Sequence, residues 1–320
     1  MGLLFIKSGI LTTVQDLGRT RFRRFGVNPA GAMDQAAARL INLLIGNDES
    51  NAVIEMHCPA PEIVFETPAV AAIGGASFSP ALDGTPLENW RAFSAKPGSV
   101  LRFGNKISGN RAYLAIQGGI KADIWLESSS TSLTAGIGGY KGKRLESGAR
   151  IEFSNAPDVQ RRLLKPRIAP SLIPRYSPFP TVRIIPGAEF NYLEPEDRHL
   201  LETENFTISN NSDRMGFRLA GRPIGFSRPL EIVSSAVTFG TVQLLPDGQL
   251  IVLMADHQTA GGYPRIAHVV TPDLPLMAQL GTNDKVAFHL IDISRAEALA
   301  VEFERELNFF RVGCKFQTNS

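Results

Sequence analysis

The chain has 320 residues, of which 43% are hydrophobic and 20% are charged, a composition that is typical of folded proteins and excludes an extended disordered chain. Lysine and arginine number 33 against 31 for aspartate and glutamate, so the net charge of +2 provides no general attraction to nucleic acid or to an anionic membrane. The length corresponds to roughly two domains, and an anion-binding site in either of them has to be local.

The spacing of the cysteines and the lengths of the apolar runs indicate in which cellular compartment the protein works. Cys58 and Cys314 lie far apart, without the spacing of a metal site or a redox pair, which fits a reducing environment and no structural disulfide. The N-terminal apolar run lacks the basic lead and the cleavage site of a signal peptide. No stretch reaches the roughly 18 unbroken apolar residues that span a bilayer. We therefore expect a cytoplasmic protein.

Short runs rich in Val, Ile, Phe and Thr, separated at close intervals by Gly, Pro, Asn and Asp, predict a mainly β fold. A Gly followed by a strand that ends in Phe recurs three times, at 97–103, 147–153 and 281–288. This recurrence favours two related β-barrel domains. The clearest strand runs lie at 3–6, 70–73, 111–116, 182–185, 250–254 and 286–291.

Helices are the exception in this pattern. The clearest one covers 34–45, where apolar residues recur at helical spacing after Asp34 as the N-cap and before Gly46 as a stop signal. Further helices are expected at 194–202 and 296–307.

The segment 155–180 carries five prolines before a sixth at its end, which predicts an ordered crossover or a semi-stiff linker. We therefore place the first barrel at 1–155, the linker at 156–180 and the second barrel at 181–320.

Several generic catalytic motifs are missing from the sequence. Residues 138–143 look like a phosphate-binding loop, but its first Gly position holds Ile137 and its hydroxyl position holds Arg144. No dinucleotide fingerprint, zinc-binding His pair or biotinylation motif is present. This chain alone is therefore not expected to be an ATPase, a dehydrogenase, a zinc hydrolase or a biotin carrier, and we expect no resident metal.

Four segments place charged and amide side chains between strands and glycines, as expected where barrel loops converge on a small polar ligand. In order, and over nearly the whole chain, they resemble the family that includes the C subunit of 5-oxoprolinase, allophanate hydrolase subunit two and the carboxyltransferase part of urea carboxylase. The matching phrases are TTVQDLGR at 12–19, GAMD at 31–34, QGG at 117–119, SDRMGFR at 212–218 and QTAGGYP at 258–264.

The resemblance implies a pair of cyclophilin-like β-barrels, in agreement with the strand pattern. It also implies work with two partners, an A-type and a barrel-type B subunit, in a complex that opens 5-oxoproline to glutamate with ATP and Mg²⁺. Relatives usually carry Ser at the position of Ala30, Arg at or beside Ser129 and Arg at the position of His257. These departures remove up to two cations from the expected pocket.

Phosphorylation of a lactam carbonyl needs donors for the developing negative charge. Arg19, Arg214 and Arg218 are the candidate donors for a carboxylate or phosphate. Asp16, Asp213 and Asp256 are candidates for orienting arginines, holding Mg²⁺ or moving a proton. We expect catalytic roles for Asp16, Arg19, Asp213, Arg214 and Asp256; ion pairs and turn-stabilising contacts are the alternative roles.

Amide side chains and glycines complete the expected site, because glutamine matches the donor and acceptor edge of an amide, and glycine permits close approach. The candidate substrate-binding residues are Gln15, Gln117, Gly118, Gly119, Arg218, Gln243, His257, Gln258, Thr259, Gly261, Gly262 and Tyr263.

Two other functions stay open. The chain is alternatively the carboxyltransferase subunit of a biotin-dependent urea or amide carboxylase, with the biotin on another chain. As a third possibility, it is a regulatory antagonist that sequesters a barrel-type kinase inhibitor. All three functions require a partner that resembles the B subunit.

Overall fold

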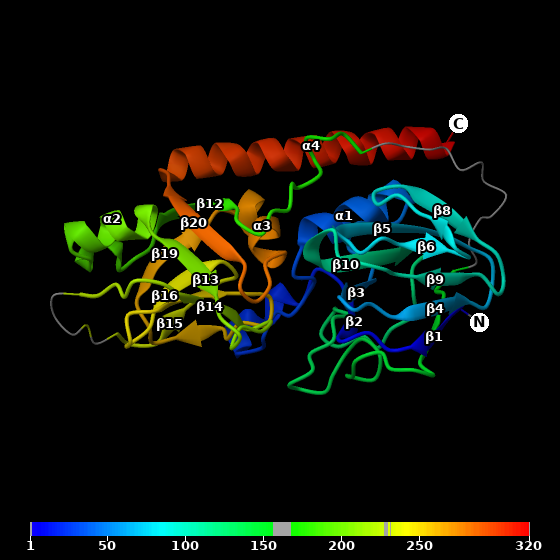
Figure 1. Ribbon diagram of the computed structural model, residues 1–320, viewed down its shortest axis with the longest axis horizontal. Coiled ribbons are helices and arrows are strands. Elements are labelled where there is room, and N and C mark those ends of the chain that lie inside the picture. The colour runs from blue at the N-terminus through cyan, green and yellow to red at the C-terminus, as the bar shows by residue number, and fades with distance from the viewer. Residues whose placement is uncertain (1, 156–167, 227–229, 231, 320) are drawn as a thin grey trace. The chain divides into compact units, whose positions relative to one another are not determined.

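The computed structural model describes residues 2–155, 168–226, 230 and 232–319, and the mainly β prediction is confirmed (Figure 1). The chain divides into two compact units. Unit 1 comprises Met1–Arg19, Ala30–Pro174 and Arg305–Ser320, and unit 2 comprises Thr20–Pro29 and Arg175–Glu304. The sequence did not predict that residues 20–29 belong to unit 2 or that the C-terminal residues belong to unit 1. The expected boundaries at 155 and 181 stay a prediction, and 156–167 of the expected linker lie outside the described residues.

Unit 1 contains two sheets that enclose an apolar core. Leu3 and Phe65 from one sheet and Ile54 and Leu114 from the other are buried in the same cluster. The strands of unit 1 are thus divided between two sheets that share this core. The first sheet runs in the order β11 (Arg150–Glu152), β1 (Gly2–Lys7), β4 (Glu62–Phe65), β9 (Val100–Arg102), β6 (Ala81–Leu82) and β7 (Thr85–Pro86). The second runs in the order β2 (Thr12–Gln15), β3 (Val53–His57), β10 (Ser108–Ile116), β5 (Ala69–Ser77) and β8 (Ala92–Ala95).

The helix α1 (Gln35–Leu44) covers the second sheet of unit 1, beside β5 and β10 (Figure 1). Asp34 caps it, since one carboxylate oxygen accepts the Ala37 N–H at 2.9 Å, and such a cap contributes about 1 kcal/mol. Leu40 and Ile41 are fully buried on its inner face. The helix predicted at 34–45 is therefore confirmed, with Asp34 as its N-cap.

Unit 2 contains a closed barrel of seven strands, and its fold confirms the barrel expected for this part of the chain. β12 (Thr181–Pro186) and β20 (Lys285–Leu290) pair in parallel, and the remaining barrel neighbours pair antiparallel. A short ribbon of β15 (Ser235–Ala236) and β18 (Ala260–Gly261) lies outside the barrel sheet. In barrel order the strands are β12 (Thr181–Pro186), β19 (Arg265–Val269), β16 (Thr241–Leu244), β17 (Leu250–Leu253), β14 (Gly216–Ala220), β13 (Asn205–Ile208) and β20 (Lys285–Leu290).

The C-terminal helix α4 (Ile293–Asn319) is much longer than the helix predicted at 296–307. Asp292 precedes it and accepts the Arg295 N–H at 2.7 Å. Leu307 and Cys314 are buried within it, so its apolar contacts continue beyond the predicted end. The remaining helical segments are α2 (Pro195–Thr203), which confirms the prediction at 194–202, α3 (Leu274–Ala278), and the 3₁₀ turns η1 (Thr20–Phe25), η2 (Phe190–Tyr192) and η3 (Thr271–Asp273).

Both cysteines are free, as expected from their spacing. Within the described ranges, none of the helices combines the length and the apolar character that a membrane crossing needs.

The glycine-rich segment 136–142 of unit 1 is a tightly packed hairpin. Gly142 has φ +67°, and a Cβ atom there would overlap the backbone of Gly136. A Cβ atom on Gly138 would likewise overlap the carbonyl oxygen of Ser130. The glycines of this segment are therefore required for close backbone packing. This requirement accounts for the glycine-rich pattern that resembles a phosphate loop.

Replacing Gly142 by Ala should lower the free energy of unfolding by about 3 kcal/mol, because left-handed strain and steric overlap add. Gly148→Ala is the matched control, since Gly148 also has a positive φ but no atom lies within 4 Å of its Cβ position. Its expected loss is about 1 kcal/mol. Urea unfolding measures both, and equal losses would contradict the packing role of Gly142.

Candidate functional site

The first polar cluster lies in unit 1 and is centred on Asp16, which directly follows β2. Its carboxylate accepts the N–H groups of Gly18 at 2.7 Å and Ser129 at 2.6 Å. It also accepts the hydroxyls of Ser128 at 2.7 Å and Ser130 at 2.5 Å. Four donors on one buried carboxylate leave little capacity for a ligand. Asp16 therefore positions the serine-rich turn at 128–130.

Arg19 belongs to the same cluster and is only 2% exposed. Its guanidinium donates to the carbonyl oxygens of Ser130 and of Trp125, the latter at 3.4 Å. It also lies over the Trp125 ring, with 5.4 Å from the guanidinium carbon to the ring centroid, a cation–π contact. The contacts of Arg19 thus hold the loops at 15–19 and 125–130 against each other.

The backbone beside this contact is strained. Leu126 and Glu127 have φ values of +47° and +61°, a region that non-glycine residues rarely occupy. Reciprocal hydrogen bonds between Trp125 and Ser128, at 2.9 Å and 3.2 Å, close the turn around them. Because strained turns persist only where their surroundings hold them, the bonds from Asp16 to the following serines keep Trp125 in place.

Gln15 and Gln117, two further candidates, each leave a buried side-chain oxygen without a hydrogen-bond partner among the described residues. Gln15 is fully buried and donates to Thr13 and Thr131. Gln117 donates to the carbonyl of Ile45 at 3.2 Å. The orphan oxygens are unsatisfied acceptors, which proteins rarely leave in their interiors.

The turn at Gly118 and Gly119 also contacts the end of α1 rather than Asp16. Both glycines have positive φ, +81° and +82°, and the Gly118 N–H donates to Asn47 at 2.9 Å. Together with Gln117, this turn therefore fixes the C-terminal end of α1 against β10.

The second polar cluster lies in unit 2, where the carboxylate of Asp256 pairs with the guanidinium of Arg214. Nε of Arg214 lies 2.9 Å from Oδ2 of Asp256, and Nη2 lies 3.1 Å from Oδ1. The Asp256 N–H also donates to the Arg214 carbonyl at 2.8 Å. The side chains are 9% and 19% exposed. A bidentate, mostly buried pair of this kind fixes the guanidinium plane, so the structure places Asp256 as the group that orients Arg214.

His257 follows this pair and is 1% exposed. Burial is the main cause that lowers its pKa; the nearby Arg23 lowers it further, while the hydrogen bond to Gln258 and the charge of Asp256 oppose the shift. The imidazole is therefore neutral at pH 7. Nδ1 lies 2.5 Å from the Gln258 carbonyl oxygen, so Nδ1 carries the proton and Nε2 is an acceptor.

The other candidates from 243–263 gather around the β15–β18 ribbon. The Gln258 amide donates to the Gln243 side chain at 3.5 Å, and Gln243 donates to the Tyr263 carbonyl at 3.3 Å. A Cβ atom on Gly261 would lie 2.8 Å from Gln243 Nε2. Thr259 accepts the Val237 N–H, Gly262 lies beside Ser234, and the Tyr263 side chain is exposed.

Asp213 and Arg218 stand apart from this cluster. Asp213 is exposed, and its carboxylate accepts the N–H groups of Met215 at 2.8 Å and Gly216 at 3.2 Å, the turn-stabilising alternative that its position allowed. Arg218 is an exposed residue of β14 between buried Phe217 and Leu219, so it faces away from the barrel interior. Their catalytic and binding roles stay predictions.

Sequence reasoning did not single out Arg23 or Asn28. Both lie in the 20–29 segment of unit 2, where Arg23 donates to the Val237 carbonyl at 2.6 Å and Asn28 to the Asp256 carbonyl at 3.1 Å. The polar, glycine-containing stretch 26–34 offers a signal for Asn28 but not for Arg23. Within the described residues, no group of three or more His, Cys, Asp or Glu side chains is arranged to hold a metal ion.

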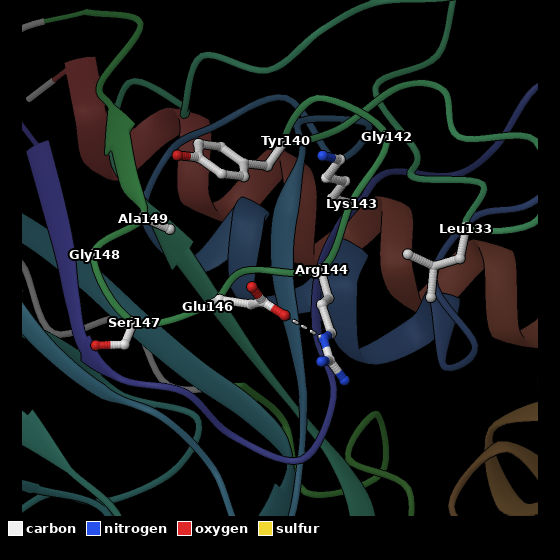
Figure 2. A pocket seen from close by; sticks show the side chains of 9 residues that line it. All are labelled: Leu133, Tyr140, Gly142, Lys143, Arg144, Glu146, Ser147, Gly148 and Ala149. Carbon is white, nitrogen blue, oxygen red and sulfur yellow. Dashed lines mark hydrogen bonds and ion pairs between the residues drawn. The ribbon is translucent and has the colours of Figure 1, made fainter.

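A separate cavity of about 570 Å³ lies in unit 1, beside the glycine-rich hairpin (Figure 2). Arg144 and Glu146 on its wall form an ion pair at 2.8 Å, drawn as a dashed line in Figure 2. Both side chains are more than half exposed, so this pair contributes little stability. None of the predicted site residues lines this cavity.

The chain is similar to known proteins over most of its length. The family model described as "Carboxyltransferase domain, subdomain A and B" matches residues 25–290. The chain is 34% identical over 299 residues to the C subunit of 5-oxoprolinase from Haemophilus influenzae, covering 93% of this chain and 94% of that protein. It is 33% identical over 310 residues to the protein of the same name from Escherichia coli, covering 96% of each.

Some relatives are larger proteins, and the region similar to this chain is only one part of them. The urea amidolyase of Saccharomyces cerevisiae is 31% identical over 295 residues, which is 88% of this chain and 16% of that protein. The crystal structure of the Kluyveromyces lactis urea amidolyase superposes with a TM-score of 0.89 and 26% identity, covering 97% of this chain and 20% of that chain.

Proposed function

Because the chain belongs to the family of carboxyltransferase domains with subdomains A and B, we propose that it is the C subunit of an ATP-dependent 5-oxoprolinase. The complex opens 5-oxo-L-proline to L-glutamate and is active only when this chain is assembled with the A and B subunits. The observation that carries this proposal is the match to the bacterial 5-oxoprolinase C subunits over 93% or more of both chains. The two free cysteines fit a cytoplasmic location.

The reaction adds one water across a lactam C–N bond, and a second water is consumed as ATP becomes ADP and phosphate. A lactam carbonyl is a poor electrophile, and ATP supplies the phosphoryl group that activates its oxygen. The negative charge lies on the oxygens of the transferring phosphoryl group, so fixed donors in a water-poor site accelerate the step. In this chain Arg214, aligned by Asp256, is the best-oriented cation of the second cluster. Gln243 and Gln258 offer amide groups that match the lactam edge.

The chain's own residues do not fit an ATP or Mg²⁺ site in the described regions. The hairpin at 136–142 packs against Ser130 and Thr131, so its N–H groups do not form an open phosphate cradle. Asp16 is fully engaged by four donors. We therefore place ATP and Mg²⁺ on a partner chain, and this chain contributes lactam binding and charge stabilisation.

One alternative has its own supporting observation. The superposition on the Kluyveromyces lactis urea amidolyase covers nearly the whole chain, which supports a carboxyltransferase component that acts on urea or a related amide. Biotin would then be carried by another chain. A regulatory antagonist of a partner that resembles the B subunit is the third candidate, and in that case the polar clusters would shape an interface.

The distinguishing experiment uses the complex purified with its candidate A and B subunits. Our proposal predicts ATP-dependent consumption of 5-oxoproline that needs no bicarbonate, and no band that binds avidin. Bicarbonate-dependent carboxylation of urea, by a complex that contains an avidin-binding chain, would contradict our proposal and support the carboxyltransferase function. Binding of the candidate B subunit without either reaction would favour the antagonist.

A further inference from the structure

The segment 20–29 is an integral part of unit 2 and brings a cation to the second cluster. Arg23 donates from Nη2 to the Val237 carbonyl at 2.6 Å, and its charge acts on the buried His257. Asn28 of the same segment donates to the carbonyl of Asp256 at 3.1 Å. The segment therefore contacts the residue just before His257 and the end of the β15 strand.

Arg23 differs from the other buried or half-buried arginines of unit 2. Arg183, Arg214 and Arg265 each place both arms of the guanidinium on one carboxylate, those of Asp273, Asp256 and Glu189. Arg198 has no carboxylate partner in the described part of the chain but donates Nε and Nη2 to backbone carbonyls.

Arg23 has no carboxylate partner among the described residues, and its Nε is buried without a hydrogen bond. Buried donors are nearly always satisfied in folded proteins, and an unfilled arginine fork matches the two oxygens of a carboxylate or phosphate. Arg23 is therefore poised for an oxyanion that the protein itself does not supply.

A second unsatisfied donor lies close in the chain to the Arg23 contact. The Ser235 hydroxyl is buried and has no hydrogen-bond partner in the described part of the chain. Ser235 stands on β15, two residues before Val237, whose backbone carbonyl accepts from Arg23. A second orphan donor thus lies within two residues of the backbone group that contacts Arg23.

The acidic and basic groups nearby leave the Arg23 charge unopposed. Asp256 is held by both arms of Arg214. His257 is buried and neutral, and its Nδ1 proton is directed at the Gln258 carbonyl. Its Nε2 is an acceptor, which suits the ring N–H of a lactam next to a bound carboxylate.

We propose that Arg23, with the Ser235 hydroxyl, forms an oxyanion-binding position in unit 2 that takes the carboxylate of the lactam substrate. The position rests on the proposed function for the identity of its ligand, but not for its existence. Phosphate shares the same chemistry and is the other source that the experiment separates.

The test measures the dissociation constants of 5-oxoproline, its uncharged carboxamide analogue and inorganic phosphate by calorimetry, on the assembled complex without ATP. Arg23→Gln should weaken 5-oxoproline binding by about 10-fold to 100-fold, as expected for the loss of one charged hydrogen-bonding group. Binding of the carboxamide should change less than about 2-fold, because it lacks the charge that Arg23 recognises. Arg24→Gln is the matched control, since the adjacent Arg24 is exposed and lies over the Phe25 ring.

Equal weakening of both lactams by Arg23→Gln would show a structural role and overturn the proposal, as would unchanged binding of 5-oxoproline. Loss of phosphate binding alone would support the oxyanion position but overturn its assignment to a carboxylate. A complex that turns over 5-oxoproline with an inert Arg23 defeats this inference and leaves the proposed function standing. A complex that ignores 5-oxoproline but binds phosphate through Arg23 defeats the proposed function and the carboxylate assignment, and leaves only the oxyanion position standing.

Discussion

Replacing Asp256 by Ala should reduce the turnover of 5-oxoproline by the assembled complex at least about 100-fold, the usual effect of removing a preorganised charge-stabilising donor. The substitution removes the carboxylate that contacts two nitrogens of Arg214 and fixes its guanidinium plane. It also takes a carboxylate partner away from a mostly buried cation. The free energy of unfolding of unit 2 should therefore fall by about 3 kcal/mol.

The same unit offers a matched control for this loss. Asp273 holds Arg183 by an equivalent two-armed contact, but neither residue belongs to the second cluster. Asp273→Ala should destabilise unit 2 by a similar amount, about 3 kcal/mol, and leave the turnover of the folded complex near wild type. Equal turnover of the two variants, corrected for the folded fraction, would contradict a functional role for the Arg214–Asp256 pair.

Asp16→Ala should have the largest effect in unit 1, lowering the free energy of unfolding by about 4 kcal/mol, because each abandoned donor in a buried site costs about 1 kcal/mol or more. Two backbone N–H groups and two hydroxyls lose a charged acceptor at once. The strained turn at Leu126 and Glu127 would lose its support, and Arg19 its position. Urea unfolding and the Trp125 fluorescence report the two effects.

Ser129→Ala is the control for Asp16. Ser129 contacts the carboxylate through its backbone N–H, so removing its hydroxyl should change the free energy of unfolding by less than about 0.5 kcal/mol. A loss for Asp16→Ala no greater than that for Ser129→Ala would show that the carboxylate does not organise the turn.

Local patterns predicted the elements whose determinants are local. The helix α1 follows from apolar spacing and the Asp34 cap, both of which lie within a short stretch of sequence. In β14, Arg218 lies on the opposite face from Phe217 and Leu219, as the alternation of side chains along a strand requires.

Long-range pairing was beyond such patterns. No local feature shows that 20–29 belongs to unit 2, because its contacts to Val237 and Asp256 join residues 214 and 228 positions apart. The same holds for Asp16, whose partners are the serines at 128–130. The sequence identified Asp16 and Asp256 as important polar residues, but only the fold shows that the first organises a loop and the second an arginine.

The most direct measurement of the central claim is ATP-dependent glutamate release from 5-oxoproline by this chain purified with its candidate A and B subunits, with each component omitted in turn. The proposed function predicts release by the full complex and none when this chain is left out. Undiminished release by the A and B subunits alone would contradict it.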